Sequence, residues 1–301
     1  VIGIISPWNY PLSLAVGDAL AALMAGNGVV IKPDSQTPYT ALRAVELLEE
    51  AGLPKGLMRV VTGQGRVVGT AIIESADYVM FTGSTETGKS IATQSAARLV
   101  DFSAELGGKN AMVVTDDIDV ERAAKVATIA CFANDGQLCI AIERIYVLAE
   151  VAEQFTKAFA AATRALRLGS EVGYGPEMGP LASADQLDKM REHVTDAVSK
   201  GATVVAGGDA RPELAPWFHE PTILTDVPAS AAVYREETFG PLVSIYPVAN
   251  VDEAIAAAND TEYGLNASVL CRDASRGRAI ARRLRAGTVN VNDGYAAAWS
   301  S

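Results

Sequence analysis

The sequence predicts an α/β protein built on parallel sheets, because strand and helix patterns alternate along the chain. Short runs of β-branched and apolar residues are each followed by a longer stretch with helical periodicity. This order is typical of a parallel sheet covered by helices on both faces. The length of 301 residues suits two domains, which we expect at residues 1–107 and 108–301 with the boundary at a Gly-Gly pair.

In the first domain, each strand is a short apolar run and each helix is an amphipathic stretch that glycine or proline ends. The expected elements are a strand at 1–5, a helix at 12–24, a strand at 29–32, a helix at 40–50, a strand at 57–61, a helix at 67–74 and a strand at 78–81. Ligands of such sheets lie beyond the carboxyl ends of the strands. We therefore expect the segments 6–9, 32–35, 62–65 and 82–88 to face one crevice.

The second domain repeats the alternation with longer helices. We expect helices at 120–132, 151–166, 184–200, 251–259 and 274–284. We expect strands at 111–114, 144–148, 203–206, 243–247, 267–270 and 288–291. The apolar runs are far shorter than the roughly 20 residues that span a bilayer, so no transmembrane segment is expected.

Composition argues against several classes of partner. The net charge is −11, whereas nucleic acid and anionic membranes demand clustered Lys and Arg, which we do not find in the sequence. Three cysteines without a CxxC pair favour a reduced, cytoplasmic compartment, and two histidines make a metal site unexpected. The chain opens within an apolar run and stops after a Gly-Tyr loop, so both ends are interpreted as cuts through a larger protein.

Cys139 is the candidate nucleophile, because it lies in the polar, glycine-led segment Gly136-Gln137-Leu138-Cys139. Glu105 stands 34 residues earlier, just before two glycines, and is the candidate general base. A thiol with a free pKa of about 8.5 needs such help at neutral pH. Cys131 on an apolar helix face and Cys271 at a strand end are expected to be packing residues.

Gly83–Ser90 matches the P-loop pattern GxxxxGK[ST] and follows a strand. Read alone, it suggests an ATPase, with Asp116 after a later apolar strand as a Mg²⁺ ligand. A glycine turn at the start of a helix also serves the pyrophosphate of a dinucleotide. A turn without any ligand is the third alternative.

Two other strand ends carry polar residues. Asn9 follows the first strand and either caps the next helix or donates a hydrogen bond to an oxyanion. Lys32 ends the second strand and is either a solvated charge or faces the expected crevice. Glu237 and Phe239 belong to a third motif, which by itself says little.

Six motifs in order resemble the aldehyde dehydrogenase superfamily over essentially the whole chain. They are Pro7-Trp8-Asn9, Lys32-Pro33, Phe81-Thr82-Gly83-Ser84, Glu105-Leu106-Gly107-Gly108-Lys109, Gly136-Gln137-Leu138-Cys139 and Glu237-Thr238-Phe239-Gly240-Pro241. The resemblance implies a Rossmann-like, NAD(P)-binding first domain and a second α/β domain that carries the nucleophilic cysteine, both truncated. It also implies oxidation of a small aldehyde, and a homo-oligomer in the full-length protein.

The resemblance also assigns roles. Cys139 is the nucleophile, Glu105 is the general base, and Asn9 with the Cys139 backbone N–H forms the oxyanion hole. Lys32 and Ser84 contact the adenosine ribose and the pyrophosphate, Trp8 lines the cofactor cleft, and Glu237 and Phe239 hold the nicotinamide ribose and ring. The cofactor site further includes Ser35, Gly65, Gly83 and Leu106.

Ser35 favours NADP over NAD, because many NAD-preferring relatives carry Glu at this position and a carboxylate would repel the 2′-phosphate. The motifs are most similar to succinate-semialdehyde dehydrogenases of a second bacterial type. Better-known members place Arg where this chain has Gly17 and Ala133, so the substrate carboxylate needs other partners. The alternatives are a non-catalytic truncated nucleotide-binding module and, more remotely, a P-loop ATPase.

Overall fold

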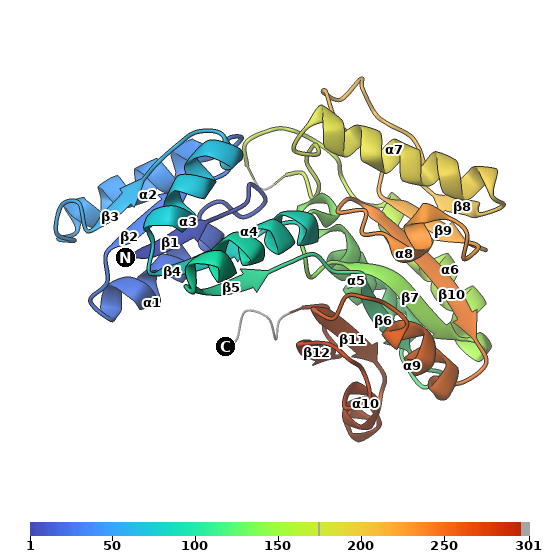
Figure 1. Ribbon diagram of the computed structural model, residues 1–301. Coiled ribbons are helices and arrows are strands. Elements are labelled where there is room, and N and C mark those ends of the chain that lie inside the picture. The colour runs from blue at the N-terminus through green and yellow to red at the C-terminus, as the bar shows by residue number, and fades with distance from the viewer. Residues whose placement is uncertain (174, 296–301) are drawn as a thin grey trace. The chain divides into compact units, whose positions relative to one another are not determined.

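The computed structural model describes residues 1–173 and 175–295. The chain divides into two compact units, residues 1–107 and the part from Gly108 onward (Figure 1). Each unit is built around its own sheet. Among the described helices, none combines the length and apolarity needed to cross a membrane.

The first unit holds a parallel sheet with strand order β3-β2-β1-β4-β5. Its strands are β1 Ile2–Ile5, β2 Val29–Lys32, β3 Met58–Val60, β4 Tyr78–Thr82 and β5 Asp101–Glu105. Its helices are η1 Ser13–Gly17, α1 Asp18–Met24, α2 Pro38–Glu50, η2 Gly65–Gly69, α3 Thr70–Ser75 and α4 Thr85–Arg98. The sequence patterns predicted the first four strands, whereas β5 was not expected.

Apolar side chains of the first unit form two clusters. One joins Ile4 and Ile31 of the central strands to small residues of η1, α1 and α2. The other joins Val79 and Phe81 to α3 and α4. Because side chains alternate between the faces of a strand, the two clusters cover opposite faces of the sheet.

The second unit holds a sheet with strand order β12-β11-β6-β7-β10-β9-β8. Its strands are β6 Asn110–Val114, β7 Ile142–Leu148, β8 Thr203–Ala206, β9 Thr222–Thr225, β10 Leu242–Val248, β11 Asn266–Leu270 and β12 Thr288–Val291. Its helices are α5 Val120–Phe132, η3 Ala133–Gly136, α6 Ala149–Arg164, α7 Ala184–Ser199, α8 Ala232–Arg235, α9 Val251–Asn259 and α10 Ala274–Ala281.

The second sheet is parallel except at one edge, where β8 pairs with β9 in antiparallel fashion. Residues 207–221, which connect these strands, contain no helix. A parallel pair needs a crossover that is usually helical, so a connection without one brings the chain back antiparallel.

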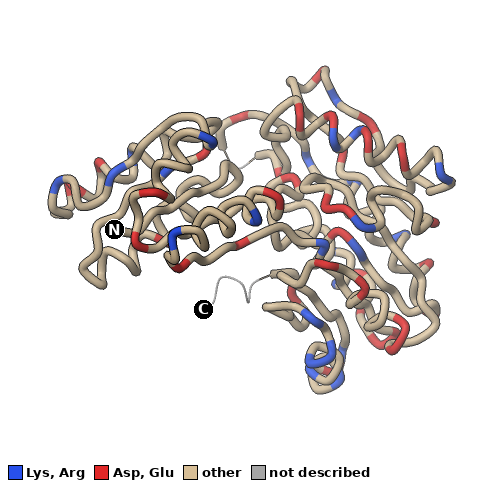
Figure 2. Tube along the Cα trace, in the orientation of Figure 1, with Lys and Arg blue, Asp and Glu red and all other residues tan. Residues whose placement is uncertain are grey.

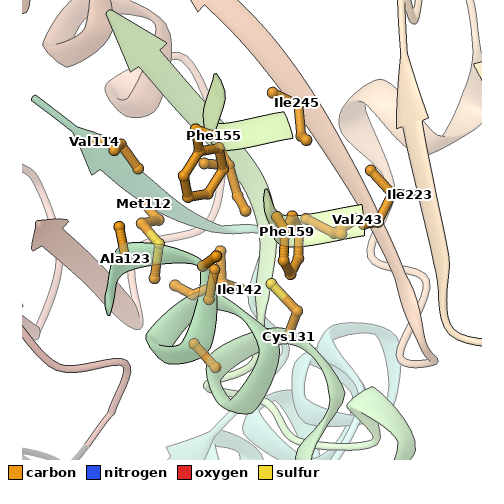
Figure 3. Packing of buried hydrophobic residues seen from close by; sticks show 14 of the residues in the cluster. Met112, Val114, Ala123, Cys131, Ile142, Phe155, Phe159, Ile223, Val243 and Ile245 are labelled. Carbon is orange, nitrogen blue, oxygen red and sulfur yellow. The ribbon is translucent and has the colours of Figure 1, made fainter. Parts of the chain in front are cut away.

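The largest core cluster of the second unit lies between the sheet and helices α5 and α6 (Figure 3). Phe155 and Phe159 of α6 are fully buried there, and Phe132 stacks on Phe159 with ring centroids 5.8 Å apart. Cys131 belongs to this cluster, and burial raises the pKa of its thiol well above the ordinary value. Cys131 and Cys271 are therefore buried packing residues, as predicted.

Acidic and basic residues are interspersed along both units, with one exception, which corrects the expectation that Lys and Arg do not cluster (Figure 2). Arginines gather on α10 and the turn after it. Two of them have acidic partners, because Arg276 pairs with Asp116 at 2.7 Å and Arg283 pairs with Asp252 at 2.7 Å. Neighbouring carboxylates thus compensate part of this positive charge.

Candidate active site

In the first unit, Lys32 lies at the carboxyl end of β2 and is only 5% exposed. Among the described residues, no carboxylate lies within ion-pair distance of its ammonium group. Ser35, in the loop that follows, donates from Oγ to the carbonyl of Gly63 at 3.3 Å. This bond joins the loops after β2 and β3, and Gly65 begins η2 directly beyond.

Gly83 and Ser84 are the only two residues between β4 and α4. Ser84 caps the helix, because its Oγ accepts a hydrogen bond from the backbone N–H of Thr87 at 3.3 Å. A Cβ at Gly83 would lie 2.6 Å from the ring of Phe81, so any larger residue there would require the ring to move. The helix starts at Thr85, which leaves no six-residue loop of the kind that cradles phosphates in a P-loop.

Glu105 ends the edge strand β5 and its side chain is exposed. Its backbone carbonyl accepts a hydrogen bond from the N–H of Gly83 at 3.0 Å. Asp18 lies in the first turn of α1, and its pKa is raised to about 6. The larger cause is burial, and the smaller cause is the negative charge of the Glu105 carboxylate. The side chain of Leu106, the next residue, packs against Gly88 of α4. A Cβ at Gly88 would lie only 2.5 Å from Cδ2 of Leu106.

Trp8 and Asn9 lie in the loop after β1 and are partly buried. They belong to the first unit together with Glu105, whereas Cys139 belongs to the second unit. The meeting of Cys139 with Asn9 and Glu105 therefore stays a prediction.

In the second unit, Cys139 lies between η3 and β7 and is partly buried. Three consecutive residues before it, Asn134, Asp135 and Gly136, have positive φ angles of 51°, 58° and 67°. A Cβ at Gly136 would lie 2.3 Å from the carbonyl oxygen of Gly240, so only glycine fits. The loop that carries the thiol is thus held in an unusual backbone conformation against the Glu237–Gly240 segment.

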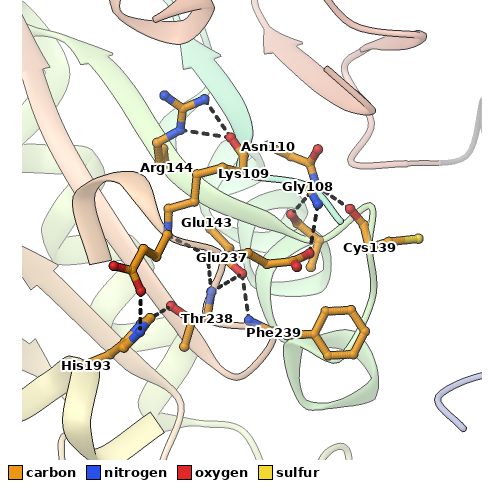
Figure 4. A network of polar contacts seen from close by, with 12 residues as sticks. Gly108, Lys109, Asn110, Cys139, Glu143, Arg144, His193, Glu237, Thr238 and Phe239 are labelled. Carbon is orange, nitrogen blue, oxygen red and sulfur yellow. Dashed lines mark hydrogen bonds and ion pairs between the residues drawn. The ribbon is translucent and has the colours of Figure 1, made fainter. Parts of the chain in front are cut away.

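Glu237 lies near Gly108, whose N–H donates to Oε1 of Glu237 at 2.8 Å (Figure 4). Burial, followed by the charge of Glu143, raises the pKa of Glu237 to about 7, and the Gly108 bond opposes this rise. Phe239, two residues on, has a φ of 57°, which is uncommon for an aromatic residue.

The Thr238-Phe239 turn is held by two polar side chains, one of which, Glu143, is buried. Glu143 of β7 accepts from the N–H groups of Thr238 and Phe239 at 2.9 Å each, and also binds the ammonium of Lys109 at 2.5 Å (Figure 4). Gln186 of α7 donates to the carbonyls of Thr238 and Phe239 at 2.9 and 2.6 Å. Burial lowers the pKa of Lys109, and Glu143 opposes that shift.

No role for Glu143, Lys109 or Gln186 was predicted from the sequence. One signal was available, because Glu143 and Arg144 place two charges in a strand that is otherwise apolar and entirely buried. Buried charges need partners, so such a pair indicates a polar network. Within the described ranges, no group of three or more His, Cys, Asp or Glu residues is arranged to hold a metal ion.

The chain belongs to the aldehyde dehydrogenase family, whose family pattern matches residues 1–301. It is 57% identical over 301 residues to a Mycobacterium ulcerans protein provisionally named succinate-semialdehyde dehydrogenase (NADP+) 2. It is 42% identical over 299 residues to a glutarate-semialdehyde dehydrogenase of Pseudomonas putida. These alignments cover 100% and 98% of the chain, but only 58% and 61% of the relatives.

Among solved structures, the betaine aldehyde dehydrogenase of Staphylococcus aureus in complex with NAD+ superposes with a TM-score of 0.93 at 36% identity. The superposition covers 97% of this chain and 59% of that one. The family fold inferred from the six motifs is thereby confirmed, and the chain spans about three fifths of the length of these relatives.

Proposed function

We propose that this protein oxidises a small aldehyde to a carboxylic acid with NADP+, with Cys139 as nucleophile, Glu105 as general base and Asn9 as oxyanion donor. The observation that carries the proposal is the position of Gly108 in the second unit. Its N–H binds the Glu237 carboxylate, and a Cβ on it would lie 2.4 Å from the carbonyl oxygen of Cys139. The backbone of the expected nucleophile and the carboxylate of the expected ribose ligand thus both lie against Gly108, in a chain that belongs to the family.

The first unit offers groups that suit a nicotinamide dinucleotide. Lys32 is buried without a carboxylate partner among the described residues, so an anionic or hydroxyl ligand would satisfy it. The hydroxyls of Ser6 and Thr82, at the ends of β1 and β4, are buried without hydrogen-bond partners. A Cβ at Gly65 would meet nothing within 4 Å, which leaves room at the start of η2.

The chemistry follows from the assigned groups. Cys139 Sγ adds to the aldehyde carbon, and the Asn9 amide with the Cys139 backbone N–H stabilises the oxyanion that forms. When bound, NADP+ would supply the acceptor for the hydride that leaves the former aldehyde carbon, and loss of that hydride would restore the carbonyl as a thioester on Cys139. Glu105 takes a proton from water, which attacks the thioester and releases the acid and the thiol.

For the substrate we propose succinate semialdehyde, which the similarity to the mycobacterial relative supports. The Pseudomonas relative makes glutarate semialdehyde the nearest competitor, longer by one methylene. One methylene is worth about 1–3 kcal/mol in a fitted pocket, so a purified enzyme should separate the two by their kcat/KM values.

The test mixes the purified protein with either aldehyde and either nicotinamide, and follows absorbance of the reduced cofactor. We expect turnover with NADP+ and succinate semialdehyde, its loss by several orders of magnitude in Cys139→Ser, and its retention in Cys131→Ala. Nucleotide binding without turnover would instead support the non-catalytic module. Hydrolysis of ATP that survives Cys139→Ser would support the P-loop alternative.

A further inference from the structure

Three buried asparagines lie on neighbouring strands, and two of them bind the backbone of the loop that carries Cys139. Asn110 begins β6, Asn266 begins β11 and Asn290 lies in β12, three strands that are adjacent in the sheet. Each is 3% exposed. A buried carboxamide is costly unless it is hydrogen-bonded, so the bonds that these side chains make are informative.

Two of the carboxamides hold the backbone that follows the nucleophile. Asn110 Nδ2 donates to the carbonyls of Cys139 and Ala141, both at 2.7 Å (Figure 4). Asn266 Nδ2 donates to the carbonyl of Ile140, between them, at 2.9 Å. Three consecutive carbonyl groups of the loop therefore accept hydrogen bonds from two side-chain amides and not from the backbone of a neighbouring strand.

The orientation of each of these two side-chain amides is fixed by a hydrogen bond to its oxygen. Asn110 Oδ1 accepts from the backbone N–H of Asn266 at 3.0 Å, and Asn266 Oδ1 accepts from Asn290 Nδ2 at 2.9 Å. Because each oxygen faces a donor, each NH₂ group must face the loop carbonyls. If an amide rotated away from the loop carbonyls, the hydrogen bond to its own oxygen would also break.

Gly108 places the same loop against the Glu237 segment. A Cβ on Gly108 would lie 2.4 Å from the Cys139 carbonyl oxygen and 2.7 Å from Asn110 Oδ1, while its N–H holds Glu237. Asn110, the Cys139 carbonyl and Glu237 therefore all meet at Gly108.

We propose that Asn110 is a positioning residue for Cys139. By holding the Cys139 carbonyl, it fixes the peptide plane and so the direction of the thiol. The inference rests on the proposed function, because it needs Cys139 to be the nucleophile. A displacement of about 1 Å in a reacting group costs on the order of 10² in rate, so loosening this peptide should be measurable.

The test compares Asn110→Ala with Thr115→Ala at the opposite end of β6. Thr115 is fully buried, and its Oγ1 lies 2.5 Å from Asp117 Oδ1 and 3.1 Å from the Leu270 carbonyl oxygen of β11, so its side chain makes polar contacts away from Cys139. Asn110→Ser is the conservative variant, since its hydroxyl can donate to one carbonyl only. Alkylation of Cys139 by iodoacetamide between pH 6 and 10 is measured alongside kcat, KM and NADP+ affinity, with Cys139→Ser as the background.

We expect Asn110→Ala to lower kcat by about tenfold to a hundredfold at nearly unchanged NADP+ affinity, and to change the rate at which Cys139 is alkylated, because the thiol is no longer held in one direction. Asn110→Ser should fall between it and the wild type, while Thr115→Ala loses stability only. A wild-type kcat and alkylation profile in folded Asn110→Ser or Asn110→Ala would overturn the proposal. Absence of aldehyde oxidation in the wild type would instead overturn the proposed function, and the alkylation profiles would still report on Asn110.

Discussion

Asp135 stands four residues before Cys139, and its carboxyl is buried with Oδ1 lacking a hydrogen-bond partner among the described residues. Burial raises the pKa of Asp135 to about 8, and a hydrogen bond from the backbone of Gly179 opposes the rise. The carboxyl is therefore protonated in the folded protein at pH 7, whereas in the unfolded chain it ionises near pH 4. The unfolded state binds fewer protons between these values, so stability falls as the pH rises from about 4 to about 8.

Asp135→Asn should abolish this part of the pH dependence. Asparagine keeps the shape of the protonated acid and tolerates the φ of 58°. The gain in the free energy of unfolding over wild type should grow with pH by up to about 1.4 kcal/mol per unit, as urea denaturation at pH 5, 6, 7 and 8 would show. Asp119→Asn, at an exposed helix cap, is the matched control. Parallel pH curves for wild type and Asp135→Asn would refute the assignment.

At the scale of elements, the segment between α8 and β10 depends on one buried ion pair. Glu143 has backbone donors besides Lys109, whereas the Lys109 ammonium has Glu143 as its ion-pair partner. Removing one partner of a buried ion pair leaves the other charge buried without compensation. We therefore expect Glu143→Met to cost about 3–5 kcal/mol and Lys109→Met to cost less.

The double variant Lys109→Met/Glu143→Met should lose less stability than the sum of the two single variants, because neither charge is left buried without its partner. A double-mutant cycle in urea measures this coupling. Asp260→Asn, which breaks the exposed pair with Arg235, serves as a reference that should change stability by less than about 1 kcal/mol. If the double variant lost as much stability as the two single variants together, Lys109 and Glu143 would not be coupled as expected.

Elements with a strong apolar pattern could be predicted from the sequence, and those without one could not. The helix Val120–Phe132 and the strand Thr288–Val291 have the predicted bounds. The edge strand Asp101–Glu105 was missed because it is polar and largely exposed, and β-pairing alone defines it. The buried strand Thr222–Thr225 was missed as well, although predicted strands such as Thr288–Val291 are equally short.

The candidate site shows the same division. Residues that belong to motifs, such as Lys32 and Ser84, could be placed at strand ends because the alternation of elements fixes those ends. Asn110 could not be assigned a role, since its partner Asn266 lies 156 residues away and nothing local marks the contact. Buried polar partners of this kind depend on strand order, which the sequence pattern leaves open.

At the scale of the whole molecule, the proposed cofactor ligands are divided between the units, with Lys32, Ser35 and Ser84 in the first and Glu237 and Phe239 in the second. A nucleotide that binds only the folded chain raises the free energy of unfolding by about 2.7 kcal/mol at a hundredfold excess over Kd. We expect NADP+ to give this stabilisation in wild type and in Cys139→Ser alike, because the thiol is not a cofactor ligand in the proposal.

Ser35→Glu tests which nicotinamide the protein prefers. Ser35 is exposed, so the variant should fold, and the new carboxylate would repel the 2′-phosphate of NADP+ but not the ribose hydroxyls of NAD+. We expect the thermal stabilisation by NADP+ to fall sharply while that by NAD+ is kept or increased. Gln36→Glu adds the same charge one residue further along the exposed loop and should alter neither. Equal losses in both variants would show a general effect of charge, and an unchanged response to NADP+ in Ser35→Glu would remove Ser35 from the cofactor site.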